Sequence, residues 1–100
     1  MTTKTIINID SDLEELIPGF LENRKADLTS FDQLLSENKI REIEVIAHKM
    51  AGNCGSYGFD LLGELSGELE ELCQGGDFNQ IQSKIEEIKN HFNSIEVSYE

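Results

Sequence analysis

The chain has 100 residues and a formal net charge of −12 at pH 7, and 38% of its residues are apolar. This length supports one domain with a single core. The acidic balance argues against nucleic acid and acidic membranes as partners, because both require a basic protein surface. No apolar run approaches the ~20 residues of a membrane span, and no signal-peptide core follows Met1, so we expect a soluble, cytoplasmic protein.

Four amphipathic helical segments follow one another along the chain. The first begins at Ser11, which forms a capping-box pattern with Glu14. Pro18 is the only proline, and it predicts a break between a short N-terminal helix and a longer one. The second segment opens near Asn38 as N-cap and ends at the glycines that begin with Gly55.

The third and fourth segments complete the predicted bundle. The third runs from about Asp60 to Cys73 and is closed by Gly75 and Gly76, and the fourth opens at Asp77. The inward stripe of the third consists of leucines: Leu61, Leu62, Leu65, Leu69 and Leu72. No segment alternates with a two-residue period, so we expect no sheet. The pattern predicts an all-α fold, an up-and-down antiparallel four-helix bundle preceded by a short N-terminal helix. One domain covers residues 1–100, with the bundle at about 10–95.

One titratable residue lies on the solvent side of the second segment. The predicted core face comprises Ile43, Ile46, Ala47, Met50 and Cys54. At ~100° per residue, His48 points roughly 140° away from the centre of that face. Neutral imidazole is a good nucleophile at physiological pH. Gly52 stands one turn later, and a glycine inside a helix costs about 1 kcal/mol relative to alanine, which suggests close approach by the backbone of a partner.

The chain resembles the histidine-containing phosphotransfer (HPt) domain family, of the stand-alone bacterial type, from about Asp10 to Ile95. The resemblance is carried by Ala47-His48-x-Met50-x-Gly52 and by Gly55-Ser56-Tyr57-Gly58-Phe59. It implies a carrier in a two-component phosphorelay rather than a turnover enzyme. His48 would accept a phosphoryl group, through Nε2, from the phosphoaspartate of a response-regulator receiver domain and pass it on. That receiver can belong to a hybrid sensor kinase. The resemblance implies no cofactor in this chain, because the Mg²⁺ belongs to the receiver.

The resemblance fails at one position near the histidine. The family usually has lysine three residues after the histidine, where this chain has Ala51. Lys49 and Asn53 are the available substitutes for supporting the phosphoryl group. The predicted docking surface for the receiver comprises Arg41, Val45, Ala51, Gly52 and Gly55. Carboxylates concentrate on the third segment, at Glu64, Glu68, Glu70 and Glu71, so we expect a less acidic zone around His48.

Two other interpretations stay open. The loss of the lysine allows a degenerate HPt-like bundle that binds a receiver or another signalling protein without transfer. Cys54 and Cys73 allow a redox-responsive or metal-responsive protein, although both fall on core stripes and read as buried, reduced thiols. We expect no metal site, because His48 and Cys54 point to different faces of one helix. Gly63 and Gly67 are expected on the outer side of the third segment. The outward-facing histidine is compatible with a monomer.

Overall fold

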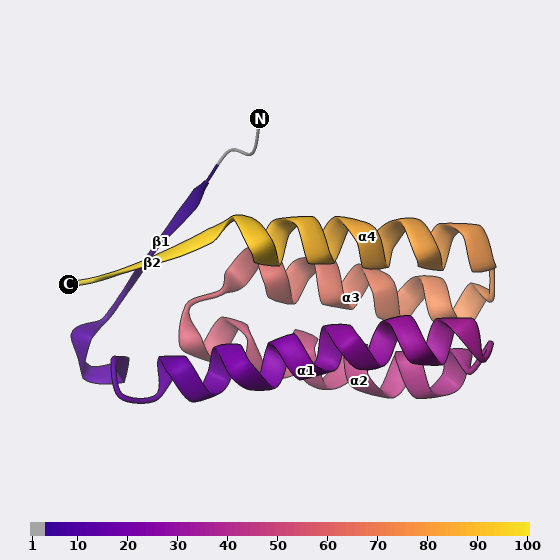
Figure 1. Cartoon of the computed structure of the whole chain (residues 1–100), viewed down its shortest axis with the longest axis horizontal. Helices are drawn as coiled ribbons and strands as arrows, with labels where there is room; N and C mark the ends of the chain where they lie inside the picture. Colours follow the sequence, from indigo (N-terminus) through magenta and orange to yellow (C-terminus); the bar gives the residue numbers. More distant parts are fainter. Residues whose placement is uncertain (1–3) are drawn as a thin grey trace.

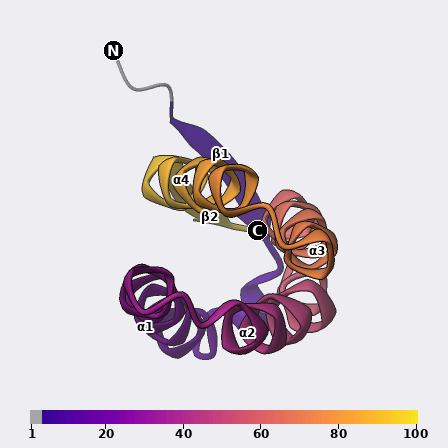
Figure 2. The ribbon, with the colours of Figure 1, turned by 90° about the vertical axis from the view of Figure 1, so that its right-hand side faces the viewer.

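The computed structural model describes residues 4–100 and contains four long helices (Figure 1). In chain order the elements are β1 (Thr5–Ile9), the 3₁₀ turn η1 (Ser11–Leu13), α1 (Ile17–Ser36), α2 (Ile40–Asn53), the 3₁₀ turn η2 (Gly55–Tyr57), α3 (Asp60–Gly75), α4 (Phe78–Ser94) and β2 (Ile95–Tyr99). Viewed end-on, α1 to α4 follow one another around the bundle (Figure 2). The predicted all-α, antiparallel four-helix bundle is confirmed.

Apolar side chains from every helix fill the core. The fully buried large side chains include Phe31 of α1, Ile43 and Met50 of α2, Leu69 of α3 and Ile85 of α4. Their burial follows the 3.6-residue periodicity of the sequence, so each helix turns one apolar stripe inward. Leu61, one of the leucines predicted to face inward, is nevertheless 47% exposed, and the apolar residues Leu16 and Phe78 are 54% and 41% exposed. Each lies at the start of a helix or just before it, where fewer neighbouring turns are present to cover a side chain.

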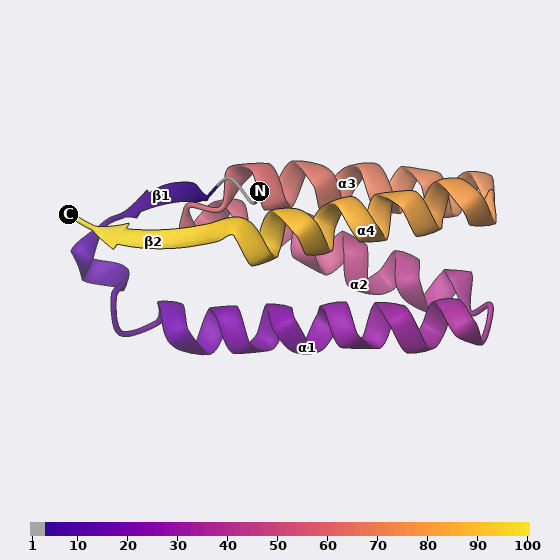
Figure 3. The same cartoon turned by 45° about the horizontal axis from the view of Figure 1, so that its top comes forward.

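The two ends of the chain form a sheet that the sequence did not predict. β1 pairs in parallel with β2, in the register Thr5 with Ile95 and Ile9 with Tyr99. The pair lies past the C-terminal end of α4, at the end of the molecule where the C-terminus lies (Figures 1 and 3). Each strand has only five residues. An alternation of apolar and polar residues over so short a segment is too weak to indicate a strand. The expectation of no sheet was therefore wrong.

Helix ends differ in detail from the predicted caps. Asp10, not Ser11, caps the first turn, because its carboxylate accepts a hydrogen bond from the backbone N–H of Asp12 at 2.9 Å. The short N-terminal helix is this single 3₁₀ turn, and α1 restarts next to Pro18, where a missing N–H is tolerated. Asn38 has a positive φ of 57° and precedes the N-cap, which is Lys39. The predicted cap at Asp77 is confirmed by its hydrogen bond from the N–H of Gln80.

The glycines of α3 face α2 rather than solvent, which corrects their predicted position. Gly63 is buried, and a Cβ added there would lie 3.6 Å from the Cβ of Cys54. A Cβ on Gly67 would lie 3.9 Å from the Cβ of Ala51. Small residues on both helices therefore allow the backbones of α2 and α3 to pack closely.

Candidate functional site

α2 holds His48 in solvent because the opposite side of the helix is anchored in the core. Ile43, Ala47 and Met50 are fully buried, and Ile46 is partly buried at the margin. This confirms the predicted core face. The side chain of His48 is 73% exposed. His48 therefore points into solvent, as the helical periodicity predicts.

The histidine has a partner on α3. The Nδ1 atom of His48 lies 2.8 Å from Oε2 of Glu70, whose side chain is 25% exposed. An ionised carboxylate can only accept a hydrogen bond, so Nδ1 carries the proton in this contact. In the neutral ring, Nε2 then holds the lone pair. Glu70 thus fixes both the orientation of the ring and the nitrogen that is free to react.

His48 lines a shallow surface hollow of about 340 Å³ between α2 and α3. We call it the histidine hollow, and its lining is Arg41, Glu44, Val45, His48, Lys49 and Glu70. The guanidinium of Arg41 donates to Glu44 at 2.6 Å, whereas Lys49 forms no ion pair with any residue in 4–100. Two carboxylates therefore share the hollow with two cations. The hollow is therefore formally neutral in a chain of net charge −12, as the expectation of a less acidic zone requires, although Glu70 reaches the histidine from α3.

Four of the five predicted docking residues line one of two separate hollows, and Gly52 lines neither. Arg41 and Val45 line the histidine hollow, and the Val45 side chain is prominent on the surface, since the residue is 53% exposed. Ala51 and Gly55 line another hollow together with residues of α3. Ala51 is turned toward Gly67, so it packs between the helices. Gly52 is exposed, and a Cβ added there would meet nothing within 4 Å.

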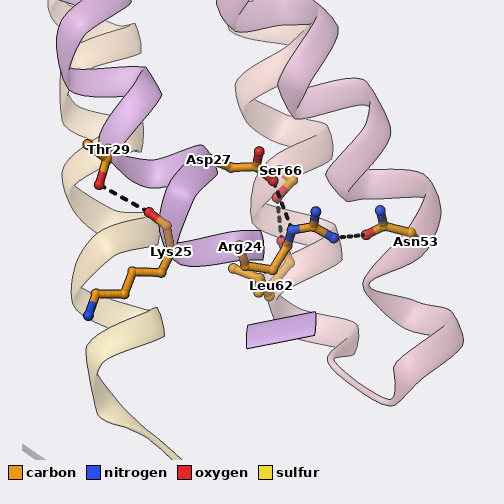
Figure 4. Close-up of polar contacts among 7 residues, drawn as sticks. All are labelled: Arg24, Lys25, Asp27, Thr29, Asn53, Leu62 and Ser66. Carbon is orange, nitrogen blue, oxygen red and sulfur yellow. Dashed lines mark hydrogen bonds and ion pairs between the residues drawn. The ribbon is translucent and has the colours of Figure 1, made fainter. Parts of the chain in front are cut away.

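Asn53 lies outside the histidine hollow and contacts α1 instead. Its side-chain oxygen accepts a hydrogen bond from Nη1 of Arg24 at 3.0 Å (Figure 4). Nε of Arg24 donates to Asp27 at 2.8 Å, and the guanidinium lies 5.0 Å from the centre of the Phe20 ring. This partly buried network ties the end of the histidine helix to α1. A role for Asn53 beside a phosphoryl group stays a prediction.

The sequence reasoning missed two residues of the site. Glu44 lies one helical turn before His48, so the four-residue spacing could have placed it on the histidine side. Glu70 is on another helix, and only the packing of α2 on α3 brings it to the imidazole. No local pattern in the sequence indicates that contact.

Both cysteines are buried and unpaired with each other. Burial raises the pKa of each thiol to about 11. The thiolate is the form that binds metals and attacks disulfides, so neither residue is poised for that chemistry near neutral pH. Within residues 4–100, no three His, Cys, Asp or Glu side chains gather as a metal site would require. None of the helices in the same range is long and apolar enough to cross a membrane.

Fold and site together define an antiparallel four-helix bundle that presents one exposed, carboxylate-oriented imidazole. The family model for the Hpt domain matches residues 15–97, and the chain belongs to this family. Hpt domains are the phosphocarrier modules of phosphorelays, and they interact with response-regulator receiver domains. No match to the chain was found among curated proteins or among solved structures.

Proposed function

We propose that this chain carries a phosphoryl group on His48, accepting it from the phosphoaspartate of a receiver domain and passing it to another receiver. The observation that carries the proposal is the contact between His48 and Glu70 on an exposed helix face. The contact keeps the proton on Nδ1 and leaves the lone pair of Nε2 free to act as the nucleophile. The partner supplies the Mg²⁺ and the acidic pocket, and this chain contributes the imidazole.

The transfer step balances without a co-reactant. The lone pair of Nε2 attacks phosphorus, the N–P bond forms, and the P–O bond to the aspartate breaks, which leaves a free carboxylate on the receiver. The ring then bears a positive charge, with its proton still on Nδ1. The carboxylate of Glu70 stabilises that charge in the same way that a buried aspartate stabilises a catalytic imidazolium. The same steps in reverse order transfer the phosphoryl group from Nε2 to the aspartate of a second receiver.

Lys49 is the cation that we assign to the phosphoryl oxygens. It lines the histidine hollow and forms no ion pair with residues 4–100, so its ammonium is available. Arg41 is engaged by Glu44, and it lies about 10 Å along the helix from His48 at 1.5 Å per residue. We therefore assign Arg41, with Val45, Ala51, Gly52 and Gly55, to docking of the receiver.

Acceptance of phosphate on His48 is the direct test. The chain is incubated with a receiver domain that has been phosphorylated with radiolabelled phosphate, in the presence of Mg²⁺. We expect label on this chain that is lost in acid and retained in base, and none on the His48→Gln variant. A phosphoramidate, as a small donor, tests the histidine without any docking. Label on His48→Gln, or none on the natural chain with either donor, contradicts the proposal.

A second function is favoured by one feature of the hollow. Ala51 replaces the usual lysine, and the histidine hollow also contains the carboxylates of Glu44 and Glu70. These features fit a bundle that binds a receiver without transfer. The Ala51→Lys variant separates the two functions. If the natural chain is a slow carrier, the added cation raises its transfer rate, up to the ~10²–10³-fold that one electrostatic contact contributes. If the chain only binds, Ala51→Lys changes affinity, and no label is found on the natural chain.

A further inference from the structure

The two-stranded sheet has an unpaired edge on each side. Within residues 4–100, the only strand beside β1 is β2, and the pair extends past the ends of α3 and α4 that lie nearest to it (Figure 3). A free edge presents backbone N–H and C=O groups that can pair with another strand. An isolated pair of strands is marginal by itself, and additional strands stabilise it.

The hydrogen bonds at the end of the sheet show which groups of β1 face outward. The carbonyl of Ile9 accepts from the N–H of Glu100, and the N–H of Ser11 donates to the carbonyl of Glu100. In a strand, the backbone groups of successive residues point to opposite edges. The odd-numbered residues of β1 therefore face β2, and Ile6 and Asn8 face the free edge. No turn, cap or side-chain hydrogen bond within residues 4–100 uses the backbone groups of these two residues.

The side chains of β1 set it apart from the rest of this acidic molecule. The chain contains 20 Asp and Glu residues, but Thr5–Ile9 contains none. Ile6 is 65% exposed, which is more than any other large apolar residue in 4–100. β2 differs, because Glu96 lies within it and Glu100 follows it. Of the two free edges, only that of β1 is neutral and apolar.

We propose that the free edge of β1 pairs with the same edge of a second copy of this chain, antiparallel and centred on Ile7. In this register Ile6 lies opposite Asn8 of the partner subunit, and the outward backbone groups of both residues meet in four hydrogen bonds across the two-fold axis. The register also sets Lys4 opposite Asp10 of the partner subunit, so opposite charges flank the neutral centre at both ends. The same arrangement on β2 would bring its glutamates together, which disfavours that edge.

The resulting four-stranded sheet would be a weak, concentration-dependent interface. It contributes one strand per subunit, less than a standard stable interface, so we expect half-association at about 10⁻⁵ to 10⁻³ M. The two bundles each carry a net charge of −12 and repel one another. Association should therefore strengthen as salt screens that repulsion. The proposal does not depend on whether His48 accepts phosphate. It predicts a dimer at high concentration, in place of the monomer expected from the outward-facing histidine.

Sedimentation equilibrium of the full chain over a range of concentrations tests this interface, with matched proline variants. Asn8→Pro removes an N–H from the free edge of β1, and Tyr99→Pro removes one from the free edge of β2. We expect a monomer–dimer equilibrium for the natural chain and for Tyr99→Pro, and at least tenfold weaker association for Asn8→Pro. Circular dichroism and thermal melting establish that each variant is folded. A natural chain that stays monomeric at millimolar concentration overturns the proposal, as does loss of the dimer in Tyr99→Pro but not in Asn8→Pro.

A cross-link gives a second measurement that does not rely on proline. In the proposed register, Ile7 faces Ile7 of the partner subunit as a non-hydrogen-bonded pair, with Cα atoms about 4.5 Å apart, which a disulfide can span. Mild oxidation should covalently link Ile7→Cys into dimers. Ser98→Cys, on the exposed side of β2, should remain monomeric under the same conditions, and the natural cysteines are buried. Linking of Ser98→Cys in preference to Ile7→Cys contradicts the register.

Discussion

At the residue scale, the chemistry of this chain depends on which imidazole nitrogen is free. Glu70 holds Nδ1 of His48 at 2.8 Å, so it selects the tautomer with an unprotonated Nε2. In the proposed transfer, the carboxylate acts through the ring and not on the phosphoryl group. Partners of this kind typically contribute 10- to 100-fold to the function of the group that they orient.

We expect Glu70→Gln to lower the rate of phosphate acceptance by about 10- to 100-fold, because the amide neither fixes the tautomer nor stabilises the charged ring. The rate is measured with phosphoramidate, and ¹⁵N NMR of the imidazole reports the tautomer. Glu71→Gln removes the same charge from an exposed neighbour on α3 and serves as the control. Equal effects of the two substitutions would indicate a general effect of charge and would remove Glu70 from the mechanism.

A substitution at Gly52 should affect docking of the receiver and stability of the fold in opposite directions. It lies in α2, is exposed, and has open space where a Cβ would be. Gly52→Ala should raise the free energy of unfolding by up to about 1 kcal/mol, since alanine is the better helix former. If the receiver approaches the helix closely here, the same variant should accept phosphate more slowly from a receiver and at an unchanged rate from phosphoramidate. Unchanged transfer from the receiver would remove Gly52 from the docking surface.

At the element scale, the spacing of α2 and α3 determines whether the site forms. Gly63 and Gly67 allow the two helices to approach, and this brings Glu70 within reach of His48. The glycines are therefore structural parts of the site although they do not face the histidine hollow. Their positions along α3 place them on the α2 side, one turn apart.

Alanine and leucine at Gly63 should have opposite effects on stability. The nearest atoms to an added Cβ are 3.6 to 3.7 Å away, which is ordinary van der Waals contact. We expect Gly63→Ala to stabilise the chain by about 0.5–1 kcal/mol through its helix propensity. Gly63→Leu should destabilise it by about 1–3 kcal/mol, because its further atoms must push the helices apart. Urea unfolding measures both, and only the leucine variant should also slow phosphate acceptance. Destabilisation by alanine would show that the interface is tighter than these distances indicate.

At the scale of the whole molecule, the terminal strands and the end of the histidine helix share one contact. Ile9 at the end of β1 is 2% exposed, and its Cδ1 lies 2.7 Å from where a Cβ on Gly58 would be. Gly58 follows η2 and has a φ of +93°, which L side chains rarely adopt. The sheet therefore packs against the turn that ends the α2 segment.

A double-mutant cycle tests this coupling between Gly58 and Ile9. Gly58→Ala should cost about 1–3 kcal/mol in the free energy of unfolding, from backbone strain and from collision with Ile9. Ile9→Val removes the colliding Cδ1 and should cost about 0.5–1.5 kcal/mol alone. Combined, the two substitutions should cost less than the sum of their separate effects, as measured by urea unfolding. Strict additivity would mean that strain at Gly58 is the whole effect and that the contact with Ile9 is unimportant.

The sequence by itself determined the four helices, the buried face of α2 and the exposure of His48, because each depends on a periodicity that spans several turns. It also indicated the cap at Asp77 and the turn at Gly76, which use local chemistry. Tertiary structure alone decided that Glu70 orients His48, that Gly63 and Gly67 face α2, and that the chain ends pair as β1 and β2. These features join residues far apart in the chain, and no local pattern specifies which distant residue a helix or strand will meet.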